Sequence, residues 1–329
     1  MSELITNRHQ HNVRWHLLAS VSALAIATGL ATAPAARADD QNHFSVELSG
    51  QYGLEAGGST QWFDPGLVGG GGEGDLLSNV PADAFMIRPS HIWNFDGAIK
   101  MQPADTDLIL RLGIQYGRAG KQARSFHYSY DTGFYTGTYS ANLRHREDHF
   151  IIDFQVGKDF GLGMFGHDGK SVFSAGIRYA HFTARTDVDF HTSTKYFSGS
   201  GREVVSRGFH GVGPMISWEA SAPIDDANGL SLDWGANVAV LFGRQTNKIR
   251  AFYSGSSTGY GGTGHRGKTV PEVGGFAALS WHCPDMNSAV SLGYKVDAWF
   301  NVLDGGFANH LDASRVMHGP FLKLAIGTN

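Results

Sequence analysis

Cysteine, charge and long apolar segments are all scarce in this 329-residue chain. Cys283 is the only cysteine, so no disulfide can form within the chain. Charged residues make up 17% of the sequence, against roughly a quarter in typical soluble domains, which disfavours an ordinary cytosolic enzyme. The formal net charge is −4, whereas nucleic-acid-binding proteins usually carry a basic excess, so we expect no nucleic-acid partner.

The one extended apolar run lies near the N-terminus. Residues 17–33, LLASVSALAIATGLATA, follow a polar opening with Arg8 and Arg14, and Ala36-Arg37-Ala38 supplies small residues where a signal peptidase cuts. We predict that residues 1–38 are a cleaved signal peptide and that 39–329 form the mature domain. The alternative is a permanent membrane anchor, which the marginal length of the run and its many Ala, Ser and Thr residues disfavour. The sequence therefore predicts an exported protein.

What the mature chain has in abundance is alternation of apolar with small or polar residues. In LSLDWGANVAVLFGR, residues 230–244, every second side chain from Leu230 to Phe242 is apolar, and successive side chains of a strand point to opposite faces. Such strands have one continuous apolar face. Ten segments show the pattern: 44–54, 93–101, 108–116, 150–157, 173–179, 212–220, 230–243, 272–282, 290–301 and 316–326.

The connections between these segments alternate in length. Shorter ones lie at 101–107, 160–170, 223–229 and 283–287, and long ones at 55–83, 118–146, 182–208, 244–268 and 302–313. This order predicts an all-β fold: a transmembrane antiparallel up-and-down β-barrel of about ten strands in the bacterial outer membrane, with short periplasmic turns and long extracellular loops. A soluble β-sandwich also alternates, but its turns are not sorted by length onto one end, and its apolar face must meet a second sheet.

In this barrel the apolar face contacts outer-membrane lipid and the other face surrounds the interior. The inward charges either line an aqueous passage and set its ion preference, or pair across a small lumen and close it. Small inward residues favour an open or partly open passage: Gly113, Gly157, Gly176, Gly213, Gly235, Gly274 and Gly293. The predicted pore-lining residues are Glu47, Arg111, Gln115, Asp153, Gln155, Arg178, Glu219, Asp233, Asn237, Glu272, Lys295, Asp297 and Lys323.

Four strand-like segments carry a family resemblance. The segments GVGPMISWEA (211–220), GLSLDWGANVAVLFGR (229–244), SLGYKVDAWFNVLD (291–304) and HGPFLKL (318–324) resemble the pore-forming outer-membrane proteins related to the Legionella major outer-membrane protein. The resemblance covers roughly residues 205–326. It implies a porin-like barrel that lets small hydrophilic solutes or ions pass passively. The alternative is a closed-lumen barrel whose long surface loops bind a partner, as an adhesin does.

No motif of the chain predicts catalysis. The glycine-rich VGGGGEGD, residues 68–75, lacks the flanking strand, helix and Lys-Ser/Thr of a phosphate-binding loop. A hydrolytic Asp–His pair at the barrel rim is the alternative, with Asp148 and His149, or Asp187 and Asp189 with His191, as candidates. Their spacing is not diagnostic, so we predict no enzyme, no catalytic residue, no metal ligand and no cofactor.

Overall fold

The computed structural model describes residues 43–62, 86–104, 106–131, 136–160, 170–195, 198–225, 228–254, 260–283, 286–306 and 311–327. The predicted signal peptide and the glycine-rich stretch 68–75 lie outside these residues. No helix among the described residues is long and apolar enough to cross a membrane.

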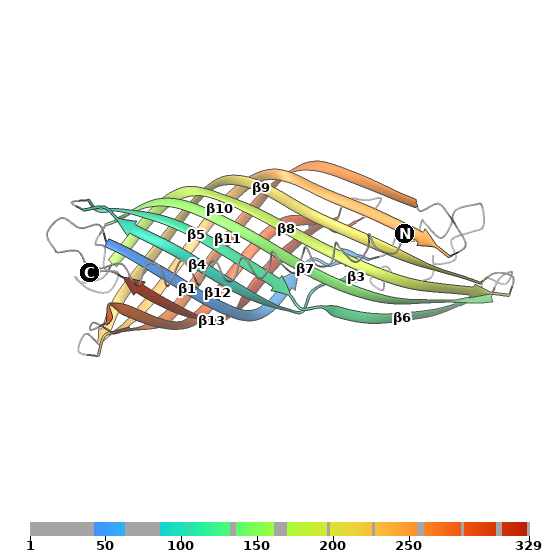
Figure 1. Cartoon of the computed structure of the whole chain (residues 1–329), viewed down its shortest axis with the longest axis horizontal. Helices are drawn as coiled ribbons and strands as arrows, with labels where there is room; N and C mark the ends of the chain where they lie inside the picture. Colours follow the sequence, from blue (N-terminus) through green and yellow to red (C-terminus); the bar gives the residue numbers. More distant parts are fainter. Residues whose placement is uncertain are drawn as a thin grey trace, which may run out of the picture.

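Ten antiparallel strands close into a barrel (Figure 1). The first strand of the ring pairs with the second and also with the last, and the third pairs with the fourth, so the ring is closed. The predicted ten-stranded antiparallel barrel is confirmed. The strands are β1 (His43–Gly57), β4 (His91–Gln102), β5 (Leu108–Ala119), β7 (Thr136–Asp159), β8 (Lys170–Thr194), β9 (Ser198–Asp225), β10 (Leu230–Tyr253), β11 (Tyr260–Cys283), β12 (Ser288–Asp304) and β13 (Asp312–Gly327).

Three further strands of the described residues lie outside this ring. β6 (Gln122–Asp131) pairs with the first part of β7, and β2 (Thr60–Gln61) pairs with β3 (Met86–Ile87) in a separate two-stranded sheet. Trp62 and Ile87 at this small sheet are buried against Tyr139 and Phe190 of β7 and β8. The described ends of the segment between β1 and β4 therefore pack against the long strands that follow it.

Three of the five long connections are mostly strand where the structure describes them, which differs from the expected loops. Segments 118–146, 182–208 and 244–268 were predicted as loops, but β7 to β11 are 24 to 28 residues long and run far into them. The β8–β9 ladder, for example, is continuous from Lys170–Ser221 to Ser193–Ser198. These strands project beyond the barrel as a curved sheet (Figure 1). We call this projection the extension: β6 and residues 136–147, 183–194, 198–209, 244–253 and 260–269.

An apolar belt surrounds the outside of the barrel. Ile216 is 63% exposed, Leu292 65% and Leu322 57%, and each points away from the interior. Exposed apolar area on this scale is unfavourable in water but favourable in lipid, and an outward apolar band is the hallmark of an outer-membrane barrel. The fold and its belt together are those of an outer-membrane β-barrel.

One barrel strand bends into the interior at its extracellular end. Asn301 has a φ of 58°, in the left-handed region that asparagine tolerates better than most residues. The register between β12 and β13 shifts between Trp299 and Leu303. Beyond the bend the alternation stops, and Val302, Leu303 and Asp304 are all buried in succession. The end of β12 therefore adds side chains to the lumen at the end of the barrel that carries the extension.

Candidate functional site in the barrel interior

The structure places the thirteen predicted pore-lining residues on the inner wall. Glu272 and Asp233 bond to inward neighbours, namely Asn237 and Arg178 for the former and three serines for the latter. The role of these residues in a passage stays a prediction. A cavity of about 140 Å³ is lined by the other eleven: Glu47, Arg111, Gln115, Asp153, Gln155, Arg178, Glu219, Asn237, Lys295, Asp297 and Lys323.

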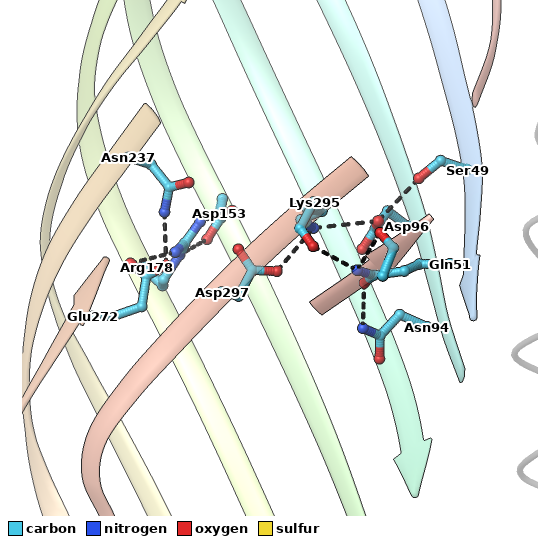
Figure 2. A network of polar contacts seen from close by, with 11 residues as sticks. Ser49, Gln51, Asn94, Asp96, Asp153, Arg178, Asn237, Glu272, Lys295 and Asp297 are labelled. Carbon is cyan, nitrogen blue, oxygen red and sulfur yellow. Dashed lines mark hydrogen bonds and ion pairs between the residues drawn. The ribbon is translucent and has the colours of Figure 1, made fainter. Parts of the chain in front are cut away.

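Arg178 on β8 is the centre of one buried network (Figure 2). Its Nε and Nη2 donate to the two carboxylate oxygens of Asp153 at 2.7 and 2.8 Å, and its Nη1 lies 2.7 Å from Oε2 of Glu272. Asn237 donates to Oε1 of Glu272 at 2.7 Å. Glu272 is fully buried, so its charge is compensated by the Nη1 contact with Arg178, while Asp153 receives the bidentate arginine contact. This network joins β7, β8, β10 and β11.

Lys295 on β12 forms a second network beside the first (Figure 2). Its Nζ lies 3.2 Å from Asp297 and 3.4 Å from Asp96, which also accepts a hydrogen bond from Ser49 at 2.9 Å. Gln51 donates to the carbonyl of Lys295 at 3.1 Å. These bonds tie β12 to β1 and β4 through the interior, across the intervening β13.

A third set of ion pairs crosses the lumen between β4 and β9. Nζ of Lys100 lies 2.9 Å from Glu47 and 3.0 Å from Glu219. Three barrel strands separate β4 from β9 along the shorter arc of the ring, so the pair joins opposite walls. Cross-lumen bonds of this kind hold the walls together and occupy the space between them.

Next to the charged networks lies a buried apolar layer. Trp299 is 1% exposed, and its ring contacts Phe182 with centroids 4.9 Å apart, while the Arg178 guanidinium lies 5.8 Å from its centroid. Eight of the ten barrel strands contribute to the cluster, so it spans the lumen. Its members are Ile92, Ile151, Ala180, Phe182, Ala184, Phe209, Met215, Ala239, Leu241, Val270, Trp299, Val302, Leu303, Ala313 and Met317.

A further ion-pair group lies at the extracellular side of this layer. Arg315 on β13 donates from Nε and Nη2 to Glu147 on β7, at 2.6 Å in each case, and lies 3.2 Å from Glu55 on β1. Glu147 also contacts His145, whose other ring nitrogen lies 2.8 Å from the Thr186 hydroxyl. The arginine side chain is 1% exposed. The group connects opposite walls a second time.

The glycines predicted to face inward differ in the space beside them: Gly113 lines the interior cavity, whereas side chains or backbone of neighbouring strands crowd others. A Cβ at Gly235 would lie 2.6 Å from the Phe276 ring, and one at Gly274 would collide with Asp297 and Asn237. The space beside these glycines is therefore filled by neighbouring side chains. A Cβ would instead meet a backbone carbonyl of the adjacent strand at three other predicted positions: Gly176, Gly213 and Gly293.

The Asp–His pairs considered from the sequence do not form. Asp148 faces outward and pairs with Arg118 at 3.2 Å, whereas His149 faces inward and stacks on Phe182. The hydrogen bonds and ion pairs of the other candidate aspartates and histidine involve different residues: Arg185 and Arg202 for Asp187, Arg144 and Arg202 for Asp189, and Ser200 for His191. Within the part of the chain that the structure describes, no group of three metal-binding side chains occurs.

Several interior residues were absent from the sequence-based set. Gln51, Asp96 and Lys100 have the inward parity of their strands, so parity alone would have found them. Glu147 and Arg315 were missed for other reasons: the first lies at the edge of a predicted loop, and the second lies just before the strand expected from Val316. Extending the alternation beyond the predicted strand ends would have recovered both.

Comparisons with known proteins give only distant matches. No protein-family model and no curated protein matches the sequence. Among solved structures, the outer membrane protease OmpT from Escherichia coli is 10% identical with a TM-score of 0.41, over 89% of this chain and 98% of that chain. The translocator domain of autotransporter NalP from Neisseria meningitidis is 9% identical with a TM-score of 0.32, over 98% of each chain. The toluene transporter TbuX from Ralstonia pickettii is 8% identical with a TM-score of 0.23, over 89% of this chain and 90% of that chain. Similarity this low carries no argument about activity.

Proposed function

We propose that this protein is an outer-membrane β-barrel whose lumen is closed to solutes and whose extracellular extension binds a partner at the cell surface. The observation that carries the first part is the apolar layer around Trp299, to which eight barrel strands contribute. A hydrated ion that crosses such a layer loses its water without gaining polar partners, which costs several kcal/mol or more. The ion pairs on both sides of the layer bind the walls together.

The length of the strands supports the proposal that the extension binds a partner. Crossing a bilayer needs about 9–11 residues of a tilted strand, whereas β9 has 28. The excess builds the extension, which has an apolar cluster of its own, including Trp62, Tyr139 and Phe190, with Phe126 packed against it. A rigid, internally packed sheet that projects from the membrane is a suitable support for recognition loops.

Planar-bilayer recording tests the closed lumen. Protein whose folding is verified by its heat-dependent gel mobility is expected to give no discrete conductance steps. A variant with Arg178→Ala and Trp299→Ala removes one network centre and the largest side chain of the layer, and is expected to conduct. Trp281→Ala is the matched control, because Trp281 is 58% exposed on the outer belt. Regular steps from the unaltered protein would contradict the proposal.

A porin-like passage is the second candidate function, with small hydrophilic solutes or ions as its cargo. The charged cavity of about 140 Å³ at the level of the belt favours it, and so does the resemblance to porin-like proteins described above. In this case the unaltered protein conducts and Lys295→Glu shifts its preference toward cations, because Lys295 lines that cavity. Unchanged selectivity in a conducting Lys295→Glu variant would exclude Lys295 from the passage.

A further inference from the structure

The outer wall carries three basic side chains without acidic partners just above the apolar belt. Arg146 on β7, and Arg244 and Lys248 on β10, form no ion pair or hydrogen bond to a carboxylate among the described residues. By contrast, the neighbouring Arg185 is neutralised, because it donates to both carboxylate oxygens of Asp187. We call Arg146, Arg244 and Lys248 the outer basic site.

The strand register places these side chains side by side on one surface. Arg146 pairs with Arg185, which pairs with Ser206, which pairs with Lys248, so one row crosses four adjacent strands. Three strand spacings separate its ends by about 14 Å. Arg244 lies four residues below Lys248 on the same strand, next to the first apolar row of the belt.

A hollow of about 480 Å³ lies in the outer wall among these residues. Arg146 and Lys248 line it, and the hydroxyls of Thr183, Ser206 and Thr246 stand between them with Gly208. The one carboxylate that lines it, Asp148, forms an ion pair with Arg118 at 3.2 Å. The hollow therefore offers uncompensated positive charge together with hydroxyl donors.

From this arrangement we propose that the outer basic site binds the phosphate of a lipid headgroup in the outer leaflet. Arginine, lysine and hydroxyl donors together recognise phosphate oxygens. The position selects the source of the phosphate, because the site is on the outside of the wall and Arg244 is two residues beyond Phe242, which is 59% exposed in the belt. The groups that adjoin an outer-membrane barrel at this height are the headgroups of the surrounding lipids.

A binding experiment with purified, folded protein in an uncharged detergent tests the proposal. The probes are bisphosphorylated lipid A, the same lipid with its phosphates removed, and inorganic phosphate, with native mass spectrometry as the measurement. The test variant is Arg146→Gln with Lys248→Gln. The matched control is Lys158→Gln with Lys170→Gln, because these exposed lysines lie at the opposite end of the barrel.

We expect the unaltered protein and the control to bind the phosphorylated lipid and to bind the dephosphorylated lipid more weakly. The test variant is expected to lose roughly 30-fold in affinity for the phosphorylated lipid, since each basic side chain near an anionic lipid surface contributes about five-fold. Equal affinity of the test variant and the unaltered protein would overturn the proposal. Inorganic phosphate bound as tightly as the lipid would overturn the lipid source. Arg244→Gln with Lys248→Gln repeats the test if the first variant does not fold.

Discussion

Replacing Arg178 by methionine measures whether the lumen is dry. The methionine keeps much of the apolar contact with Trp299 but removes the charge. It leaves Asp153 and Glu272 without their arginine, and these side chains are 12% and 0% exposed. Two buried carboxylates then remain without the cation that contacts both of them.

The expected loss depends on how much water reaches the network. Breaking a buried ion pair by removing one partner costs about 3–5 kcal/mol, because the remaining charge is uncompensated. Breaking an exposed pair costs about 1 kcal/mol or less. The exposed fractions of these residues place the network in the first class, so the free energy of unfolding should fall by about 3–5 kcal/mol.

Urea unfolding of the barrel in micelles, followed by tryptophan fluorescence, gives this free energy. Lys158→Met is the control, because Lys158 forms a 3.4 Å ion pair with Asp107 in which both side chains are about half exposed or more. Adding Glu272→Gln to Arg178→Met should recover part of the loss, since an amide tolerates burial better than a carboxylate. A loss for Arg178→Met no larger than that for Lys158→Met would refute the dry lumen.

Three further outcomes follow from the belt, the apolar layer and the extension. Ile216→Lys should reduce stability in lipid by about 2–4 kcal/mol, because Ile216 lies in the middle of the belt, and an unchanged unfolding midpoint in bilayers would argue against lipid contact there. Trp299→Ala should cost about 3–5 kcal/mol and remove the near-ultraviolet signal of a fixed indole; retention of that signal would show that it has another source. Burial by itself would raise the pKa of Asp187, but hydrogen bonds from Arg185 and Arg202 outweigh it and lower the pKa from its ordinary value of 3.8. The stabilisation from Asp187 is therefore present above about pH 4 and is lost as the pH falls through the lowered pKa, so hydrogen exchange of the β8–β9 hairpin should accelerate in acid, and Asp187→Asn should abolish that dependence.

Alternation predicted the barrel because each strand must satisfy two different surroundings. Leu292 and Tyr294 are on the apolar outer face while Lys295 faces inward. The two surroundings therefore require apolar side chains to alternate with small or polar ones along each strand. The ten strands followed from this alternation. The sequence did not show how far the strands continue above the belt, because there the outward residues are polar and the contrast between faces weakens, as at Arg144 and Arg146.

The alternation along each strand predicted which residues face the interior, but not which of them contact one another. Parity placed Arg178, Asp153 and Glu272 on the same wall surface, but only the ring order shows that β8 and β11 lie near enough for a direct bond. The apolar layer was missed for a related reason. Phe182 belongs to the segment 182–208 expected as a loop, and Phe209 lies between that segment and the strand expected from Val212, so the inward direction of neither ring was considered.

The seam between β1 and β13 joins the two ends of the described chain, with Ser45 opposite Gly327. Closing it brings together segments separated by nearly the whole sequence, a step with a high entropic cost and therefore a slow one. Until it closes, both partners are unpaired edges that can add to another chain. We therefore expect assembly to be most exposed to mispairing before β1 and β13 pair, and a factor or membrane environment that shields these two edge strands would protect it.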